Sequence, residues 1–157
     1  MNDRSDHPGV IAPPPLIYLG FLLAGWGLAQ VLPDPGLGLT DLARRSIALV
    51  LIVLGLVVDA AAAGQFRRLG TNVEPWKPST ALATGGLYRL SRNPIYVGMA
   101  VVFVGFAVAM DSLIALAALI PCLVTIDRLV IVREETYLAA RFGDAYAAYC
   151  KTARRWL

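Results

Sequence analysis

The chain has 157 residues, of which 57% are hydrophobic and only 16% are charged, and its formal net charge is +3. Soluble domains average about 45–50% apolar and about 25% charged residues, so this composition predicts one membrane-embedded domain rather than a water-soluble core. The lysines and arginines lie beside hydrophobic runs instead of along an amphipathic face, which argues against nucleic-acid binding.

Four hydrophobic runs follow an entry segment, residues 1–15, which is polar and then proline-rich and is not expected to be helical. The predicted spans cover residues 16–32, 46–64, 95–110 and 112–132. A spanning helix needs about 20 apolar residues, so the third run either crosses with little tilt or ends at the interface. Only Asp111 separates the last two runs, which predicts an antiparallel helical hairpin.

The distribution of Lys and Arg residues predicts the orientation. Twelve of the 14 lie in segments on the side of the N-terminus, and only Arg44 and Arg45 lie in the opposite loops. The positive-inside rule then places both termini, the loop 65–94 and the tail 133–157 in the cytoplasm. The predicted fold is all-α, an integral membrane helical bundle of about four transmembrane helices with a short cytoplasmic tail, forming a single domain over residues 1–157.

The tail is predicted to form two short helices. Gly143 ends the first, which runs from Glu134 to Phe142, and Asp144 caps the second. Three aromatic residues lie three or four positions apart across this break: Phe142, Tyr146 and Tyr149. The simplest interpretation is an aromatic stripe that packs on the membrane hairpin.

Two acidic residues lie inside predicted spans, where ionisable groups are costly and usually functional. Asp59 is late in the second span, and we favour pairing with a cation or exposure at the interface. Asp127 is late in the fourth span, where pairing with Arg128 and a catalytic role are equally open. Asp127 and Glu134 are seven positions apart and are expected to share one helix face. The adjacent acids Glu134 and Glu135 also have a simpler explanation, because negative charges at the start of a helix interact favourably with the helix dipole.

The polar loop before the third span supplies a second cluster. Pro94 suits the first helical position and keeps Asn93 out of helical geometry. The free N–H groups of such a helix start can receive an anionic group, and Arg92 adds a bidentate carboxylate binder beside them. Tyr88 and Tyr96 supply flat amphipathic faces. Each of these side chains alone is typical of an interfacial anchor, whereas their combination at a helix start favours a binding site.

Three separated motifs carry a resemblance to a known family. They are residues 86–98 (GLYRLSRNPIYVG), the Glu134–Glu135 pair after the hairpin, and residues 142–149 (FGDAYAAY) followed by Arg-Arg-Trp at 154–156. This pattern resembles the isoprenylcysteine carboxyl methyltransferase family and the related bacterial phospholipid-methyltransferase-like proteins, over nearly the whole chain. The resemblance implies S-adenosylmethionine as methyl donor, S-adenosylhomocysteine as product, and a location in a bacterial inner (plasma) membrane.

The resemblance also implies which residues form the donor pocket. Arg92 and Glu135 would be catalytic. The implied cofactor-binding residues are Tyr88, Arg92, Asn93, Pro94, Tyr96, Gly98, Glu134, Glu135, Tyr146 and Tyr149. Many members have His at the position of Asn93. Because an Asn side chain keeps a hydrogen-bond donor and an acceptor but does not titrate, no general-base role is assigned to it.

These observations predict a membrane methyltransferase that acts on a lipophilic small molecule or lipid through a carboxylate, thiol or amine. The main alternative is an NADPH-dependent sterol or steroid reductase, since such enzymes resemble this loop in an Arg-x-Pro-x-Tyr stretch. They commonly carry an acid shortly after that tyrosine, and this chain has none from Val97 to Ala100. A non-catalytic membrane partner is the third interpretation. No metal site is expected, because Cys122 and Cys150 are far apart and the only histidine, His7, lies in the N-terminal segment.

Overall fold

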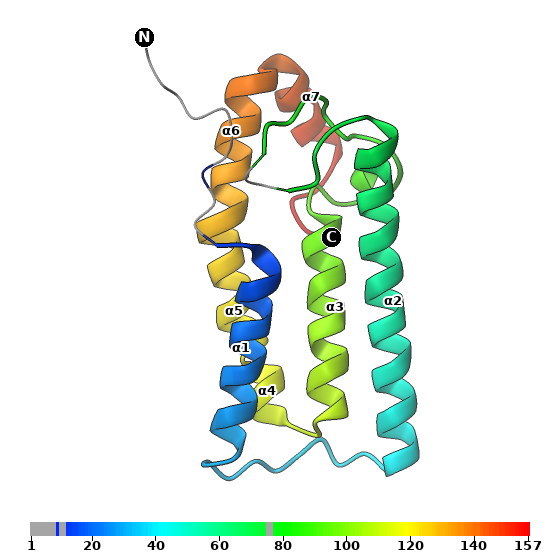
Figure 1. The fold of residues 1–157 in the computed structure, drawn as a ribbon, viewed down its shortest axis with the longest axis vertical. Helices are drawn as coiled ribbons and strands as arrows, with labels where there is room; N and C mark the ends of the chain where they lie inside the picture. Colours follow the sequence, from blue (N-terminus) through cyan, green and yellow to red (C-terminus); the bar gives the residue numbers. More distant parts are fainter. Residues whose placement is uncertain (1–8, 10–11, 75–76) are drawn as a thin grey trace.

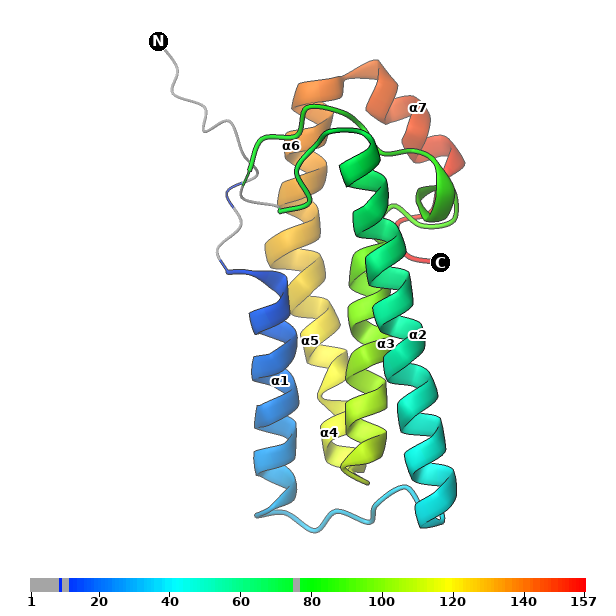
Figure 2. The same ribbon diagram turned by 45° about the vertical axis from the view of Figure 1, so that its right-hand side comes forward.

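The computed structural model describes residues 9, 12–74 and 77–157, and within them the predicted all-α fold is confirmed. The elements are α1 (Pro14–Ala29), α2 (Asp41–Arg68), η1 (Gly86–Arg89), α3 (Pro94–Ala109), α4 (Leu113–Ala117), α5 (Leu119–Ile126), η2 (Asp127–Ile131), α6 (Val132–Phe142) and α7 (Asp144–Thr152). η1 is a 3₁₀ helix, and η2 is a π-helical turn. Figures 1 and 2 show the long helices side by side in an upright bundle.

The first helix differs from the predicted span at both ends. It begins at Pro14 rather than at residue 16, because proline fits the first turn of a helix, where no N–H is needed for hydrogen bonding. It ends at Ala29, before the predicted residue 32, and has 16 residues.

The second helix is longer than predicted. α2 has 28 residues and extends the predicted span 46–64 in both directions. At its start, the Thr40 side chain accepts a hydrogen bond from the backbone N–H of Ala43. At its end, Arg67 and Arg68 place positive charge in the last turn, where it interacts favourably with the helix dipole.

Helical structure continues from Leu113 to Phe142, so the predicted tail helix is continuous with the fourth run rather than separate from it, and the end of the span at residue 132 stays a prediction. The π turn η2 absorbs an extra residue without breaking the helix. Gly143 (φ 50°) ends α6 as predicted. Asp144, however, is the first residue of α7 and makes no capping hydrogen bond, because the flanking position belongs to Gly143.

Two helical stretches among the described residues are long and apolar enough to cross a membrane, α2 and Leu113–Phe142. The helices α1 and α3 are apolar but have 16 residues each. The count of four transmembrane helices therefore stays a prediction.

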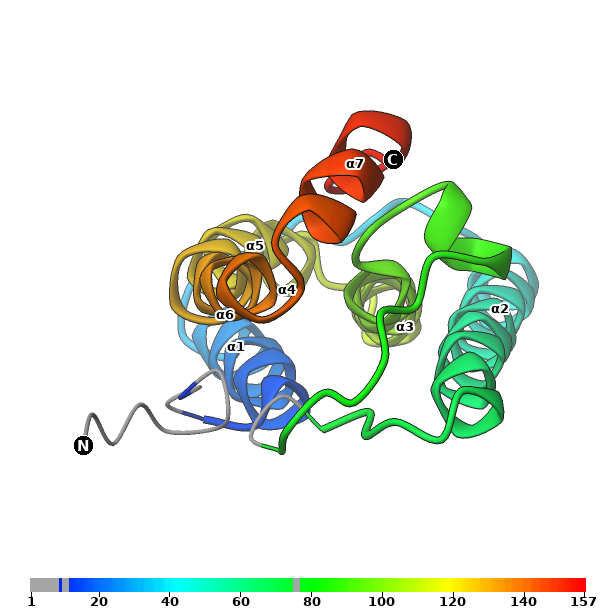
Figure 3. The ribbon, with the colours of Figure 1, turned by 90° about the horizontal axis from the view of Figure 1, so that it is seen from above.

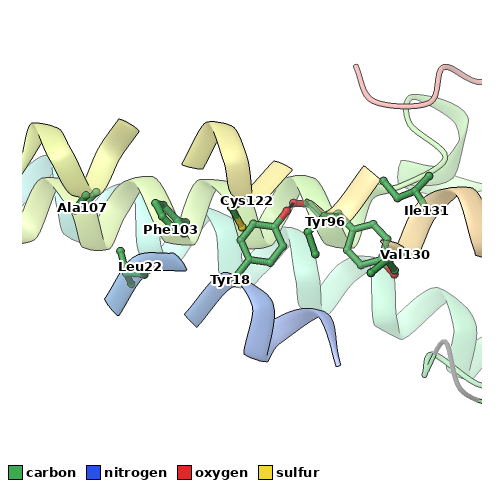
Figure 4. Close-up of a cluster of buried hydrophobic side chains, with 10 residues drawn as sticks. Tyr18, Leu22, Tyr96, Phe103, Ala107, Cys122, Val130 and Ile131 are labelled. Carbon is green, nitrogen blue, oxygen red and sulfur yellow. Dashed lines mark hydrogen bonds between the residues drawn. The ribbon is translucent and has the colours of Figure 1, made fainter. Parts of the chain in front are cut away.

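The main hydrophobic core lies between α1, α3 and the stretch α4–η2, and Figure 4 shows its side chains. Tyr18 and Leu22 of α1 meet Tyr96 and Phe103 of α3 there. The Tyr18 hydroxyl donates a hydrogen bond to the backbone carbonyl of Tyr96 (2.8 Å), which gives the one polar atom of this ring a partner.

α2 packs on α3 outside this core, through glycines. A Cβ added at Gly55 would lie 2.7 Å from the carbonyl oxygen of Gly98, so the two backbones approach more closely than any side chain allows. Figure 3 shows α3 between α2 on one side and α1 with α4–α6 on the other. α3 is therefore the central helix of the bundle.

One end of the bundle, which we call the polar end, carries the loop 69–93, the first turn of α3, α6, α7 and the residues 153–157 (Figures 1 and 3). The connection 30–40 and the turn at Asp111 (φ 53°) lie at the opposite end. The loop and the tail, which the charge pattern assigns to one side, thus meet in space.

Candidate functional site

A pocket opens at the polar end between the loop 69–93, α3, α6 and α7. The space inside it that holds no protein atoms is about 810 Å³, its open mouth included. Eight of the ten predicted cofactor-binding residues line it: Tyr88, Arg92, Asn93, Tyr96, Glu134, Glu135, Tyr146 and Tyr149. Within the described part of the chain, no three His, Cys, Asp or Glu side chains are grouped to hold a metal ion.

Arg92 connects the loop to the C-terminal residues. Its backbone N–H donates to the carbonyl of Arg154 (2.7 Å), and its Nη1 donates to the carbonyl of Ala153 (2.9 Å). Its Nη2 donates to Glu135 (2.9 Å). Burial alone would lower the pKa of Arg92, but the hydrogen bond and charge of Glu135 raise it, so the side chain stays a cation. Its buried Nε has no hydrogen-bond partner among the described residues.

Glu135 is held between two arginines. Arg92 contacts its Oε1, and Arg155 contacts both of its oxygens, with Nε at 3.1 Å from Oε1. The hydrogen bond to Glu135 raises the pKa of Arg155, whose Nη1 also lies 3.4 Å from Asp127. Because both carboxylate oxygens of Glu135 already have cationic partners, this side chain belongs to an ionic network within the protein: Arg92, Glu135, Arg155 and Asp127.

The π turn decides which acids lie together. An extra residue in η2 shifts the register, so that Asp127 shares Arg155 with Glu135, eight positions further on. The prediction that Asp127 and Glu134 share a face is therefore wrong. Arg128 also lies 3.9 Å from Asp127, so of the two open interpretations of Asp127 the structure bears out pairing.

Glu134 has a different environment from its neighbour. Its Oε1 accepts a hydrogen bond from the Tyr96 hydroxyl (2.7 Å), and no arginine or lysine of the described chain pairs with it. The side chain lines the pocket with hydrogen-bonding capacity left over, because its second carboxyl oxygen has no hydrogen-bond partner among the described residues.

Asn93 has a non-helical backbone (φ −128°, ψ 48°), and α3 begins at Pro94, as predicted. Its Nδ2 donates to the carbonyl of Arg155 (2.8 Å). Its backbone N–H donates to the hydroxyl of Ser91 (3.0 Å). Ser91 in turn forms an isolated parallel β-bridge with Arg154 in the C-terminal segment. The amide nitrogen of Asn93 is thus used to hold the C-terminal residues.

Tyrosines form one wall of the pocket. The Tyr149 hydroxyl donates to the carbonyl of Tyr88 (2.7 Å), and the Tyr88 ring meets Phe66 of α2 edge to face at 5.3 Å. Burial raises the pKa of Tyr149 to about 12 and raises those of Tyr88 and Tyr146 as well, so all three remain neutral near pH 7. The predicted packing of this stripe on the membrane hairpin is wrong, because α7 turns at Gly143 to cover the loop instead.

Two predicted residues, Pro94 and Gly98, do not line the pocket: Pro94 starts α3, and Gly98 contacts Asp59 of α2. Asp59 forms no ion pair with a described residue, so of its two favoured interpretations pairing is wrong, and exposure at the interface stays a prediction. Sequence reasoning missed the positioning of Glu135 by Arg155, because the terminal Arg-Arg-Trp motif contains Arg155 but does not show which group it contacts. It also missed further lining residues, of which only Ile95 lies in one of the three motifs: Phe66, Asn72, Val73, Glu74, Ser79, Ala81, Leu82, Ala83, Ile95, Tyr137 and Leu138.

Residues 43–145, about two thirds of the chain, match the protein family described as phospholipid methyltransferase. The chain belongs to the phospholipid methyltransferase family. This membership and the two long apolar helices make it a membrane protein and point to a methyltransferase. The family match includes Arg92, Tyr96 and the Glu134–Glu135 pair and ends within α7. The chain is also 32% identical over 63 residues to a Haemophilus influenzae protein described as uncharacterized. The aligned part makes up 40% of this chain and the whole of that protein.

Proposed function

We propose that this member of the phospholipid methyltransferase family transfers a methyl group from S-adenosylmethionine to a lipophilic acceptor at the cytoplasmic membrane face. The pocket carries the proposal, because it joins an aromatic wall to an acid that has no cationic partner among the described residues, Glu134, where apolar helices end. The donor supplies its methyl on a sulfonium, already a good leaving group. Positioning and charge stabilisation by the protein can therefore provide most of the catalysis.

The residues of the pocket fit such a donor. Glu134 offers a negative charge to the cationic groups of the donor, and Tyr88 and Tyr146 offer ring faces to its adenine or its sulfonium. Arg92 offers a positive charge for the donor carboxylate. Glu135, engaged by two arginines, is proposed to position Arg92 rather than to touch the ribose.

The remaining predictions belong to the same proposal. The chain acts as one membrane-embedded domain of a bacterial inner membrane, with both termini and the pocket in the cytoplasm. The twelve-to-two distribution of Lys and Arg residues supports that orientation. The acceptor reaches the pocket from the bilayer, since the pocket lies directly beyond the apolar helices α2 and α3.

Titration calorimetry of the purified chain with S-adenosylhomocysteine tests the proposal. We expect binding by the wild type and a loss of about tenfold or more in Glu134→Gln, equivalent to one charge-assisted interaction. Asp144→Asn, an exposed acid on the adjacent helix α7, is the matched control and should bind as the wild type does. Unchanged binding in Glu134→Gln would contradict the assigned role.

The two alternatives give different results in the same preparation. A reductase would be stabilised against heat by NADPH and not by S-adenosylhomocysteine. A non-catalytic partner would respond to neither compound. The family match favours methyl transfer over both.

A further inference from the structure

An apolar groove runs along α3 outside the donor pocket. Val97, Val101 and Val104 of α3 line it, together with Leu51 of α2 and Leu123 of α5. Every side chain that lines the groove is apolar, and the space inside it that holds no protein atoms is about 670 Å³, its open side included. The proposed methyl transfer assigns no role to this space.

The groove and the donor pocket lie on opposite faces of α3. Ile95 lines the pocket, whereas Val97 lines the groove. Residues two positions apart in an α-helix point about 160° away from each other, so α3 itself separates the two spaces. In Figure 3 the C-terminus and η1 lie on one side of α3, and the first part of the loop 69–93 lies on the other side. The groove is therefore a second binding space and not an extension of the pocket.

The groove has the direction and the depth of a lipid chain in one leaflet. Val97 and Val104 are seven residues apart on one face of α3, a distance of about 10 Å along the helix. The hydrocarbon of one leaflet is about 15 Å thick, half of the usual core of about 30 Å. Trp156 and Leu157 also line the groove, and the backbone bond from Arg92 to Arg154 places these C-terminal residues at the polar end. The groove thus begins where the polar end meets the bilayer and runs into the hydrocarbon.

The surface at the polar end of the groove is cationic and partly apolar. The β-bridge between Ser91 and Arg154 brings Arg154 close to Arg89 of η1. Both arginine side chains are exposed, and neither forms an ion pair with a residue that the structure describes. Leu90 is 65% exposed and Leu157 is 73% exposed on the same segments. Exposed leucines beside basic residues are typical of a surface that rests among lipid head groups.

Trp156 lies between this cationic surface and the groove. Its ring packs against the main core and lines the groove, whereas its indole N–H makes no hydrogen bond with a described residue. Tryptophan is enriched at membrane–water interfaces, where the ring is in contact with apolar groups and the N–H reaches polar ones. Trp156 therefore marks the level at which hydrocarbon gives way to head groups.

We propose that the groove binds one acyl chain of a resident anionic phospholipid, and that Arg89 and Arg154 bind the phosphate of its head group. Charge selects this lipid, because two arginines without acidic partners attract a head group with a net negative charge more than a zwitterionic one. The bound lipid is distinct from the methyl acceptor, since the groove lies across α3 from the donor pocket. Its binding requires no donor and is independent of the proposed methyl transfer.

The experiment measures which lipid stays on the protein. The full chain is equilibrated with mixed micelles of phosphatidylglycerol and phosphatidylcholine in equal amounts and with the same acyl chains, and native mass spectrometry measures the lipid retained. Arg89→Gln and Arg154→Gln each remove a cation, and Arg45→Gln, an exposed arginine at the opposite end of the bundle, is their control. Val101→Phe fills the groove, and Val53→Phe, half-exposed on α2 and outside the groove, is its control.

We expect the wild type and both controls to retain about one phosphatidylglycerol molecule in preference to phosphatidylcholine. Each of Arg89→Gln and Arg154→Gln should lower that preference about fivefold, which corresponds to the contribution of about 1 kcal/mol from one basic residue near an anionic head group. Val101→Phe should retain about tenfold less of both lipids, because the chain loses its apolar contacts. An unchanged preference in both arginine variants would overturn the assignment of the phosphate.

Photolabelling locates the lipid on the wild type and needs no substitution. Phosphatidylglycerol with a diazirine on its acyl chain should label residues 97–104 or Leu123, and an excess of the unlabelled lipid should suppress the labelling. A wild type without preference for phosphatidylglycerol overturns the proposal, as does labelling confined to α6 and the loop 69–93 or spread evenly over the exposed faces of α1 and α2. A dimer that retains no lipid would show that a second copy of the chain covers the groove instead.

Discussion

Replacement of Glu135 by Gln tests whether this acid stabilises the fold or binds the donor. The Glu135 carboxylate accepts hydrogen bonds from Arg92 and Arg155. The side chain of Glu135 is 19% exposed, that of Arg92 is 15% exposed, and that of Arg155 is 41% exposed. A hydrogen bond to a charged group contributes about 1.5–3 kcal/mol when it is well buried, and less where solvent screens it. The bond to Arg92 falls in that range, and the bond to the half-exposed Arg155 adds a smaller amount.

We therefore expect Glu135→Gln to lower the free energy of unfolding by about 2–4 kcal/mol, because it also leaves two cations facing each other. Arg155→Met alone should cost about 1–2 kcal/mol, since Arg92 still neutralises Glu135. In the double variant the two losses should not add, and a coupling of about 1 kcal/mol is expected for directly contacting groups.

The assay is equilibrium unfolding in mixed micelles, followed by circular dichroism for the helices. Glu74→Gln is the control, because Glu74 pairs with Lys77 in an exposed ion pair of similar length (2.7 Å) and should change nothing measurable. A Glu135→Gln protein as stable as the wild type, or strictly additive losses with Arg155→Met, would refute the network. If Glu135→Gln is as stable as the wild type but binds the donor much more weakly, Glu135 contacts the donor directly.

Three further results are expected in the same unfolding assay. Gly98→Ala should cost about 1–3 kcal/mol, because its Cβ overlaps Asp59 and this overpacking exceeds the gain of about 1 kcal/mol in helix propensity; a more stable variant would contradict the close contact. Ser112→Ala should cost about 1–2 kcal/mol, because the hydroxyl caps α4 at Ala115 and donates to Asp34; Thr125→Ala, on the exposed side of α5, is its control. Burial raises the pKa of Tyr149 in the folded protein to about 12, above the usual value near 10. The stability that its neutral form contributes is therefore present below pH 10 and lost as the pH rises towards 12. In Tyr149→Phe the free energy of unfolding should fall less steeply over this pH range.

The parts of the fold that the sequence predicts correctly are those with a local cause. Pro94 begins α3 and keeps Asn93 non-helical, and Gly143 ends α6, because ring geometry and the lack of a Cβ act on the residue itself. The turn at Asp111 is found for another local reason, since two adjacent apolar helices must reverse where only one polar residue separates them. The ends of α1 and α2 were less accurate because hydrophobicity marks where a helix is apolar rather than where it is helical.

Part of the pocket lining was predictable from the sequence, but the contacts between its residues were not. Motif residues far apart in the chain do gather around one pocket, as Tyr88, Tyr96 and Glu134 show. Which groups pair inside it depends on the C-terminal residues folding back, and no local pattern reveals that Arg155 reaches Glu135. That Asp59 has no partner among the described residues is likewise a property of packing, since the position of an arginine nearby in sequence does not show which helix face it occupies.

The π turn explains why two adjacent glutamates have different roles. Neighbouring residues on a helix point about 100° apart, so Glu134 and Glu135 can never face the same group. By inserting one residue after Ile126, η2 turns Glu135 towards Arg155 and Asp127 and leaves Glu134 facing Tyr96. In a regular α-helix without the extra residue, Glu134 rather than Glu135 would face Arg155. The contact of Glu134 with Tyr96 in the pocket and the contact of Glu135 with the tail are thus set by a single local departure from α-helical geometry, as is frequent for π turns at functional sites.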